Sequence, residues 1–261
     1  MKLRTLFLAL AAVFAPLASA ELLYTVREAD DVLSTIDTAT GNVSAIGALG
    51  VNFEFGDLAF DQSTNTMYAV GGWGNGIGAV SDLFSVNLTT GAATLIGSTG
   101  QRDVFGLVWD PTTGKLFGSA STISTGFFEI NKTTGAGSLI GTPGISLDAL
   151  TYDGSTGNIL GMFAGPGSLH YVDRNTGAAT LANGGSGFVN NNGMAYVGSN
   201  NSVYSLDWSG DFYRYDLSNS FARTTITNVG AAYDGLAAVP EPATMVALGA
   251  GLLALARRRR K

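Results

Sequence analysis

Short runs of alternating hydrophobic and polar residues, separated by turn sequences, fill most of the 261-residue chain. The clearest copy is LFSVNLTTGAATLIG at residues 83–97, in which two alternating runs flank an Asn-x-x-Thr-Gly sequence. Alternation over five or six residues is typical of a β-strand, and an Asn or Asp followed by Gly suits a tight reversal of the chain. This stretch therefore predicts two antiparallel strands joined by a short turn.

The same unit recurs along the chain, with an Asn or Asp at one fixed place in each copy. These marker residues are Asp37, Asn87, Asn131, Asp173 and Asp216, at intervals of 50, 44, 42 and 43 residues. The fifth copy lacks the Thr-Gly, and an insertion at residues 71–82 lengthens the first interval. A period of this size with four strands per unit is typical of a propeller blade. We therefore predict an all-β fold, a five-bladed β-propeller with four strands per blade.

Each unit also contains a short strand before the hairpin and a strand rich in Gly and Ala after it. We place the Gly- and Ala-rich strand innermost, because small residues suit the crowded centre of a propeller. The repeat region begins with the second strand of a blade, at residues 22–26, and ends with a first strand, at residues 235–239. We expect these two segments to complete one blade, which closes the ring without an open edge.

Strand alternation sorts the connections between two faces of the predicted ring. The Asn/Asp-x-x-Thr-Gly turns share one face, which we call the turn face. The inner strands begin on the other face, the loop face, together with the insertion at residues 71–82. Asp61, Asp110 and Asp153 end inner strands just before turns, and we interpret them as structural residues.

Residues 1–20 have the three-part form of a secretory signal peptide. Lys2 and Arg4 precede an apolar stretch, and the small residues Ala-Ser-Ala end the segment. An uncleaved anchor helix is the alternative interpretation, and in both cases the chain is exported. Residues 21–239 are then predicted to form one propeller domain, because propellers exceed the usual length of a domain.

Composition limits the chemistry available to this domain. There is no cysteine and His170 is the single histidine, so disulfides, thiolate chemistry and multi-histidine metal sites are excluded. Of the 14 Lys and Arg residues, two lie in the first 20 residues and five at the C-terminal end, which leaves a strongly acidic repeat region. Such a surface disfavours nucleic acid and is compatible with divalent cations or neutral glycans.

Candidate ligand-binding residues gather at the predicted loop face. Asp148, Asn192 and Asp234 occupy one equivalent position at the start of an inner strand, Asp57 lies one residue further in, and the insertion adds Trp73. Carboxylate and amide oxygens around a channel mouth can hold Ca²⁺ or a sugar. In the alternative interpretation, which we favour, these side chains cap turns and orient strands. The sequence indicates no cofactor other than this Ca²⁺.

No catalytic constellation is evident, and no catalytic residue is predicted. Asp57, Asp148 and Asp234 could in principle form the carboxylate set of a glycosidase, but nothing in their spacing favours it. Trp109 and Trp208 adjoin predicted blade strands, and we interpret both as packing residues.

The C-terminal residues 239–261 form a separate tail. Pro240, Glu241 and Pro242 precede an apolar run at residues 243–256, and the chain ends with Arg257, Arg258, Arg259, Arg260 and Lys261. We expect the apolar run to form a short transmembrane helix, with the basic residues at its cytoplasmic end. The tail closely resembles the PEP-CTERM sorting signal of Gram-negative bacteria. That resemblance implies recognition by an exosortase, removal of the tail near the Pro-Glu-Pro, and delivery to the cell surface or exopolysaccharide matrix.

These observations together predict an exported surface or matrix protein. Its propeller would act as a binding or structural module, associated with exopolysaccharide. The alternative is an extracellular propeller hydrolase that acts on glycans or lactones, and a purely structural protein without a ligand is a third possibility.

Overall fold

The computed structural model describes residues 22–71, 78–121, 125–163, 165–185, 187, 189 and 191–240, with the backbone alone at Asn191 and Asn192. The predicted signal peptide, Trp73 and the tail from Glu241 onward lie outside the described residues. Within the described part, two short 3-10 helices, Gly198–Asn200 and Leu217–Asn219, accompany the strands, and no helix is long and apolar enough to cross a membrane.

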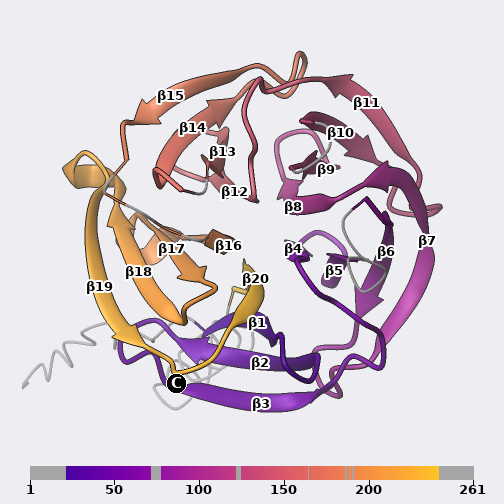
Figure 1. Ribbon diagram of the computed structural model, residues 1–261, viewed down its shortest axis with the longest axis horizontal. Coiled ribbons are helices and arrows are strands. Elements are labelled where there is room, and N and C mark those ends of the chain that lie inside the picture. The colour runs from indigo at the N-terminus through magenta and orange to yellow at the C-terminus, as the bar shows by residue number, and fades with distance from the viewer. Residues whose placement is uncertain are drawn as a thin grey trace, which may run out of the picture.

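Twenty strands form five four-stranded antiparallel sheets around a central axis, so the predicted five-bladed β-propeller is confirmed (Figure 1). The blades, each given from its inner to its outer strand, are as follows. Blade 1 contains β20 (Tyr233–Ala238), β1 (Leu22–Arg27), β2 (Val32–Asp37) and β3 (Val43–Ala48). Blade 2 contains β4 (Asp57–Asp61), β5 (Thr66–Gly71), β6 (Val80–Val86) and β7 (Ala93–Arg102). Blade 3 contains β8 (Val104–Asp110), β9 (Lys115–Ala120), β10 (Gly126–Ile130) and β11 (Gly137–Gly141). Blade 4 contains β12 (Ala149–Asp153), β13 (Asn158–Phe163), β14 (Ser168–Val172) and β15 (Ala179–Asn183). Blade 5 contains β16 (Asn191–Val197), β17 (Ser202–Asp207), β18 (Asp211–Asp216) and β19 (Ala222–Asn228).

The two ends of the repeat region close the ring, as predicted. Strand β20 pairs antiparallel with β1, with Leu23 opposite Ala238 and a bulge between Tyr24 and Val26. The buried hydroxyl of Thr25 donates to the carbonyl of Gly235 at 2.8 Å. Blade 1 therefore joins strands from opposite ends of the domain, and the first and last described residues leave the ring on the turn face.

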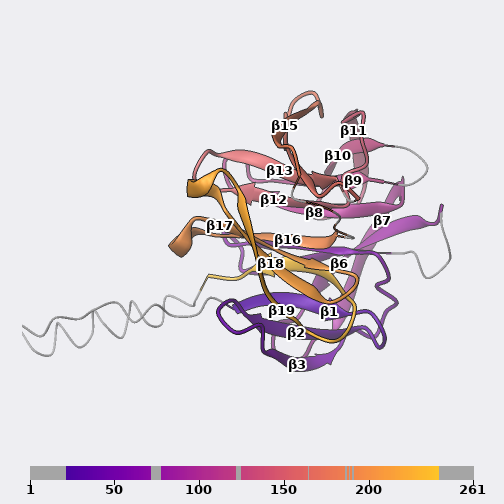
Figure 2. The same ribbon diagram turned by 60° about the vertical axis from the view of Figure 1, so that its left-hand side comes forward.

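The hydrophobic core is divided among the five seams between blades. Each of five buried clusters combines side chains from two neighbouring sheets. Figure 2 shows the sheets of the ring in a view turned by 60° from that of Figure 1. Between blades 3 and 4, for example, the rings of Phe117 and Phe127 stack at 5.3 Å within the cluster that also holds Leu150 and Ile159. A blade cannot bury both of its apolar faces alone, so the ring folds as one unit.

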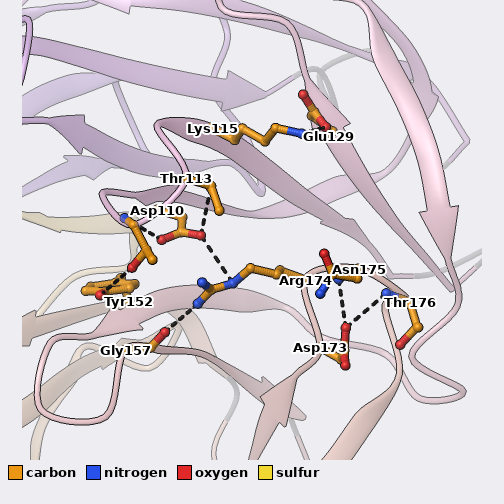
Figure 3. Close-up of polar contacts among 11 residues, drawn as sticks. Asp110, Thr113, Lys115, Glu129, Tyr152, Gly157, Asp173, Arg174, Asn175 and Thr176 are labelled. Carbon is orange, nitrogen blue, oxygen red and sulfur yellow. Dashed lines mark hydrogen bonds and ion pairs between the residues drawn. The ribbon is translucent and has the colours of Figure 1, made fainter.

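Ion pairs reinforce two of these seams on the turn face. Arg174, one residue after the marker Asp173 of blade 4, reaches the buried carboxylate of Asp110 in blade 3 at 3.3 Å and also donates to the carbonyl of Gly157 (Figure 3). Lys132 of blade 3 reaches the buried carboxylate of Asp61 in blade 2 at 2.8 Å. These contacts support the structural interpretation of both aspartates.

Candidate functional site

Asp57, the first residue of β4, lies fully buried at the centre of the ring. Its Oδ2 accepts hydrogen bonds from the backbone N–H groups of Leu107 in β8 and Leu150 in β12, at 2.9 and 3.4 Å. Its Oδ1 accepts from Leu58 in the same strand and from Leu236 in β20, at 2.8 and 3.3 Å. One carboxylate thus connects the inner strands of four blades.

The other inner strands carry small residues beside Asp57. A Cβ atom on Gly235 would lie 3.0 Å from the Cα atom of Asp57, and one on Gly193 would lie 2.5 Å from the carbonyl carbon of Gly235. The axis therefore accommodates one carboxylate and no second large side chain at this level. Burial raises the pKa of Asp57 well above its usual range, and the surrounding N–H groups, that of Leu107 foremost, offset part of the rise. Both oxygens of this predicted ligand residue are thus engaged by the fold.

A cavity of about 370 Å³, which we call the axial cavity, opens from this level onto the turn face. Its wall repeats from blade to blade, because each inner strand contributes three successive residues and the turn that follows. The innermost layer consists of Leu58, Leu107, Leu150, Met194 and Leu236. The second layer consists of Ala59, Val108, Thr151, Ala195 and Ala237. The third layer consists of Phe60, Trp109, Tyr152, Tyr196 and Ala238, and the rim includes Gln62, Pro111 and Pro240.

Four of the five blades place an aromatic residue in the third layer. Trp109 is nearly buried, and its indole N–H has no hydrogen-bond partner within the described part of the chain. The ammonium of Lys132 lies over this indole, 4.0 Å from the ring centre. The hydroxyl of Tyr152 lies 2.8 Å from the hydroxyl of Thr112. None of the residues that line the cavity is charged, so its chemistry suits a neutral ligand with an apolar face.

The loop face has a different character, centred on Asp234 in β20. Asp234 is 1% exposed, its Oδ2 accepts the backbone N–H of Phe55 at 3.3 Å, and its Oδ1 has no hydrogen-bond partner among the residues described. Burial raises the pKa of Asp234 well above its usual range, and the charges of Glu28, Glu54 and Asp31 raise it further. Loops of blades 1 and 2 thus place three further carboxyl groups within electrostatic range of Asp234.

Aromatic rings adjoin these carboxyl groups. The ring of Phe55 lies 5.7 Å from that of Phe105 and 5.9 Å from that of Trp208. The indole N–H of Trp208 donates to the carboxylate of Glu28. The interpretation of both tryptophans as packing residues holds for Trp109, which is 7% exposed, but is wrong for Trp208, which is 44% exposed.

The structure brings together only part of the predicted ligand ring. Asp148 directly precedes β12, is half-buried, and accepts a hydrogen bond from the hydroxyl of Ser121. Asn192 is the second residue of β16, but its side chain, like the whole of Trp73, lies outside the described residues. The described side chains contain no cluster of three or more His, Asp or Glu residues suited to a metal ion.

Sequence reasoning missed both the axial cavity and the acidic neighbours of Asp234. The cavity had a sequence cue, because Phe60, Trp109 and Tyr152 each stand directly before a recurring Asp at the end of an inner strand. Glu28 and Glu54 had none, since they lie in loops of different length that only the closed ring places side by side.

Comparison with known proteins identifies the tail. A family model, the PEP-CTERM protein-sorting motif, matches residues 238–261, which confirms the resemblance drawn from the Pro-Glu-Pro, the apolar run and the basic end. The motif implies processing by an exosortase, and it is consistent with export and a cell-envelope or surface location in Gram-negative bacteria. A search of curated proteins gave no match for the chain.

Solved structures resemble the propeller. One is a structural genomics protein of unknown function from Bacteroides thetaiotaomicron, with 16% identity and a TM-score of 0.56 over 84% of this chain. This chain spans 64% of the length of that protein. Another is a chain in the crystal structure of a nidogen/laminin complex, with 13% identity and a TM-score of 0.58 over 85% of this chain and 82% of that one. At such identities the likeness concerns the fold alone.

Proposed function

We propose that this protein is exported, that an exosortase processes its tail, and that the propeller remains at the cell surface or in the matrix, where it binds glycans. The proposal starts from a sorting motif that begins where the closed ring ends. The observation that carries the proposal is the position of the motif. It starts at residue 238, the last residue of β20, which is the innermost strand of blade 1. Cleavage near Pro240 would remove the whole tail and no strand of the ring.

The place where the chain leaves the ring also suggests how the propeller would face the membrane before processing. Pro240 lies at the rim of the axial cavity, so the chain leaves the ring beside the cavity mouth on the turn face. Residue 22, where β1 begins, lies on the same face because β1 and β20 are antiparallel. A tail held in the membrane would therefore keep the turn face toward the membrane, and processing would open the cavity mouth to the surroundings.

The axial cavity supports binding of a neutral exopolysaccharide. Aromatic rings stack on the apolar faces of sugars, and besides the nearly buried Trp109 the third layer supplies the rings of Phe60, Tyr152 and Tyr196, with no charged residue in the lining. The acidic repeat region would repel acidic polysaccharides. We expect binding without turnover, so the proposed role is that of a module and not of a hydrolase.

One experiment in the native host and one with the purified protein test the two parts of this proposal. For sorting, the mass and location of the protein are compared with those of Glu241→Ala and of a variant lacking residues 257–261. We expect both variants to keep the tail and to stay with the membrane fraction. Unchanged mass and location would contradict processing through this motif.

For binding, the purified full-length protein is applied to an array of neutral polysaccharides, and both retention and released sugars are measured. Tyr152→Ala, which removes one ring of the axial cavity, should reduce retention about 10-fold. Trp208→Ala, on the loop face, is the matched aromatic control and should retain the neutral glycan like the wild type. Release of sugars would favour the hydrolase, and equal retention by Tyr152→Ala would reject the cavity as the binding site.

A further inference from the structure

Only one of the two carboxylate oxygens of Asp234 accepts a hydrogen bond from the described residues, although the side chain is buried from solvent. The residue is 1% exposed, and its Oδ1 has no donor among the described residues. Buried carboxylate oxygens in folded proteins nearly always have a partner. An orphaned oxygen of this kind indicates a donor that comes from outside the described chain.

The described chain places three carboxyl groups within electrostatic range of Asp234, and none of its described cations is paired with this carboxylate. Glu28 and Asp31 come from the loop between β1 and β2, and Glu54 from the loop before β4; all three act electrostatically on Asp234. The nearby Arg27 is already paired with Asp30, through contacts of 2.8 and 2.5 Å. In the free protein the carboxyl can carry its own proton, and a positively charged donor is the partner that would replace that proton.

The aromatic residues beside these carboxyl groups specify the kind of cation. The rings of Phe55, Phe105 and Trp208 form a continuous row, and the indole of Trp208 is anchored to Glu28 by its N–H. Phe55 has φ at 53°, a backbone conformation that is unusual for an aromatic residue. Aromatic faces attract organic ammonium groups and stack on sugar rings, whereas Ca²⁺ requires several oxygens at short range.

We propose that the loop face binds a sugar bearing a free amino group, with its ammonium held by Glu28 within electrostatic range of Asp234 and its ring against Trp208 and Phe55. This site is separate from the axial cavity, because the axis between the two is filled by Asp57. The inference therefore goes beyond the proposed binding of neutral glycans and does not depend on it.

The test compares two tetrasaccharides, one of glucosamine and one of N-acetylglucosamine, by isothermal titration calorimetry with the purified full-length protein. At about pH 6 glutamate side chains are ionised. The glucosamine tetrasaccharide should bind at least about 10-fold more tightly than its acetylated counterpart, because acetylation removes the charge. Equal affinities, or no binding of the glucosamine form, would overturn the proposal.

Variants locate the binding site. Asp234→Asn and Trp208→Ala should each weaken glucosamine binding about 10-fold. Glu129→Gln, which alters an exposed carboxylate paired with Lys115 in blade 3, is the charge-matched control and should bind like the wild type. Tyr152→Ala, in the axial cavity, should also leave this affinity unchanged, which separates failure here from failure of the neutral-glycan proposal.

Two further outcomes would contradict the proposed binding of an amino sugar at the loop face. Unchanged affinity in Trp208→Ala would do so even if Asp234→Asn does not fold, because the Trp208 ring is largely exposed. Binding of Ca²⁺ that requires Asp234 and blocks glucosamine would assign the site to a metal ion.

Discussion

Asp57 connects four blades through hydrogen bonds that depend on one side chain. Its donors are backbone N–H groups of inner strands, so no substitution in those strands other than one by proline removes them. The remaining inner strands make room with small residues such as Gly193 and Gly235. The stability of the centre therefore rests on a single carboxylate.

Replacement of this carboxylate should be costly. Asp57→Ala leaves four buried N–H groups without their acceptor, and we expect the free energy of unfolding to fall by about 3–5 kcal/mol. Asp57→Asn should lose less, because one acceptor oxygen is kept. Urea denaturation at neutral pH measures both, with Glu129→Ala as a surface control. A loss below about 1 kcal/mol for Asp57→Ala would contradict the proposed role at the axis.

Asp234 should make stability depend on pH in the opposite sense to an ion-paired carboxylate. Its pKa is raised in the folded protein, so the folded state holds this proton more tightly than the unfolded state. The stabilisation from that proton is complete below the unfolded pKa of about 4 and is lost as pH rises toward the folded pKa. Asp234→Asn cannot titrate, so its free energy of unfolding relative to the wild type should increase between pH 4 and pH 7, by about 1–3 kcal/mol.

Thermal and urea unfolding at a series of pH values measure this difference. A difference that stays constant with pH, or one that favours the wild type more strongly at pH 7, would show that Asp234 is not a destabilising buried acid. The expected result also links stability to function, because the same substitution removes the proposed amine site.

At the scale of the elements, equivalent positions in the seams between blades hold an ion pair in some seams and an apolar pair in another. The inner strands of blades 2 and 3 end in Asp61 and Asp110, which face a cation from the next blade, Lys132 or Arg174. In the core cluster between blades 1 and 2, Val239 and Leu88 pack against the same group of buried residues. Charged pairs and apolar pairs therefore both join neighbouring blades at this position.

This equivalence predicts a rescue. Although burial raises it, hydrogen bonds from Lys132 and Ser63 hold the pKa of Asp61 below its usual value, so the carboxylate stays charged. Lys132→Leu should therefore lower the free energy of unfolding by about 3 kcal/mol, because it leaves that buried charge uncompensated. Adding Asp61→Val should recover most of the loss by copying the seam between blades 1 and 2. A double variant no more stable than Lys132→Leu would refute the equivalence.

Local sequence was sufficient to predict the strands and their turns. The marker Asp173, for example, accepts the N–H groups of Asn175 and Thr176 at 2.7 and 3.1 Å, as an Asp-x-x-Thr-Gly turn requires (Figure 3). The residue after the marker could not be assigned in this way, because the partner of Arg174 lies in another blade, 64 positions earlier at Asp110. The meeting of Asp57 with Leu236 likewise could not be assigned, because the repeat pattern predicted closure of the ring but not which groups meet at its axis.

At the scale of the whole molecule, the ring presents two separate faces. Asp57 fills the axis, the turn face holds an uncharged cavity, and the loop face holds an acidic aromatic cluster. From the sequence, a ligand site on the loop face was the less favoured interpretation, and it was expected as a ring of carboxylate and amide oxygens. The observed cluster is asymmetric, because it is built from loops of blades 1, 2 and 5, including those that carry Glu28, Glu54 and Trp208.

Truncation should distinguish the tail from the ring. A chain that ends at Pro240 keeps β20, and we expect it to unfold in a single transition at the same temperature as the full-length protein. A chain that ends at residue 232 lacks β20, which exposes the edge of β1 and removes the hydrogen bond from Leu236 to Asp57. It should aggregate or unfold at least about 10 °C lower. Size-exclusion chromatography and thermal scans check both, and equal behaviour of the two chains would contradict closure through β20.

The pairing of β20 with β1 also fixes the order of events during biosynthesis. Blades 2 to 5 each use one continuous stretch of chain, whereas Thr25 and Gly235, which meet in blade 1, are 210 positions apart. Contacts between such distant segments form late, and the ribosome delivers β20 after every other strand. The sorting tail follows immediately behind it. The peptide that an exosortase cuts thus becomes available only when the strand that completes the ring has been made, so maturation of the tail and completion of the fold are set to coincide.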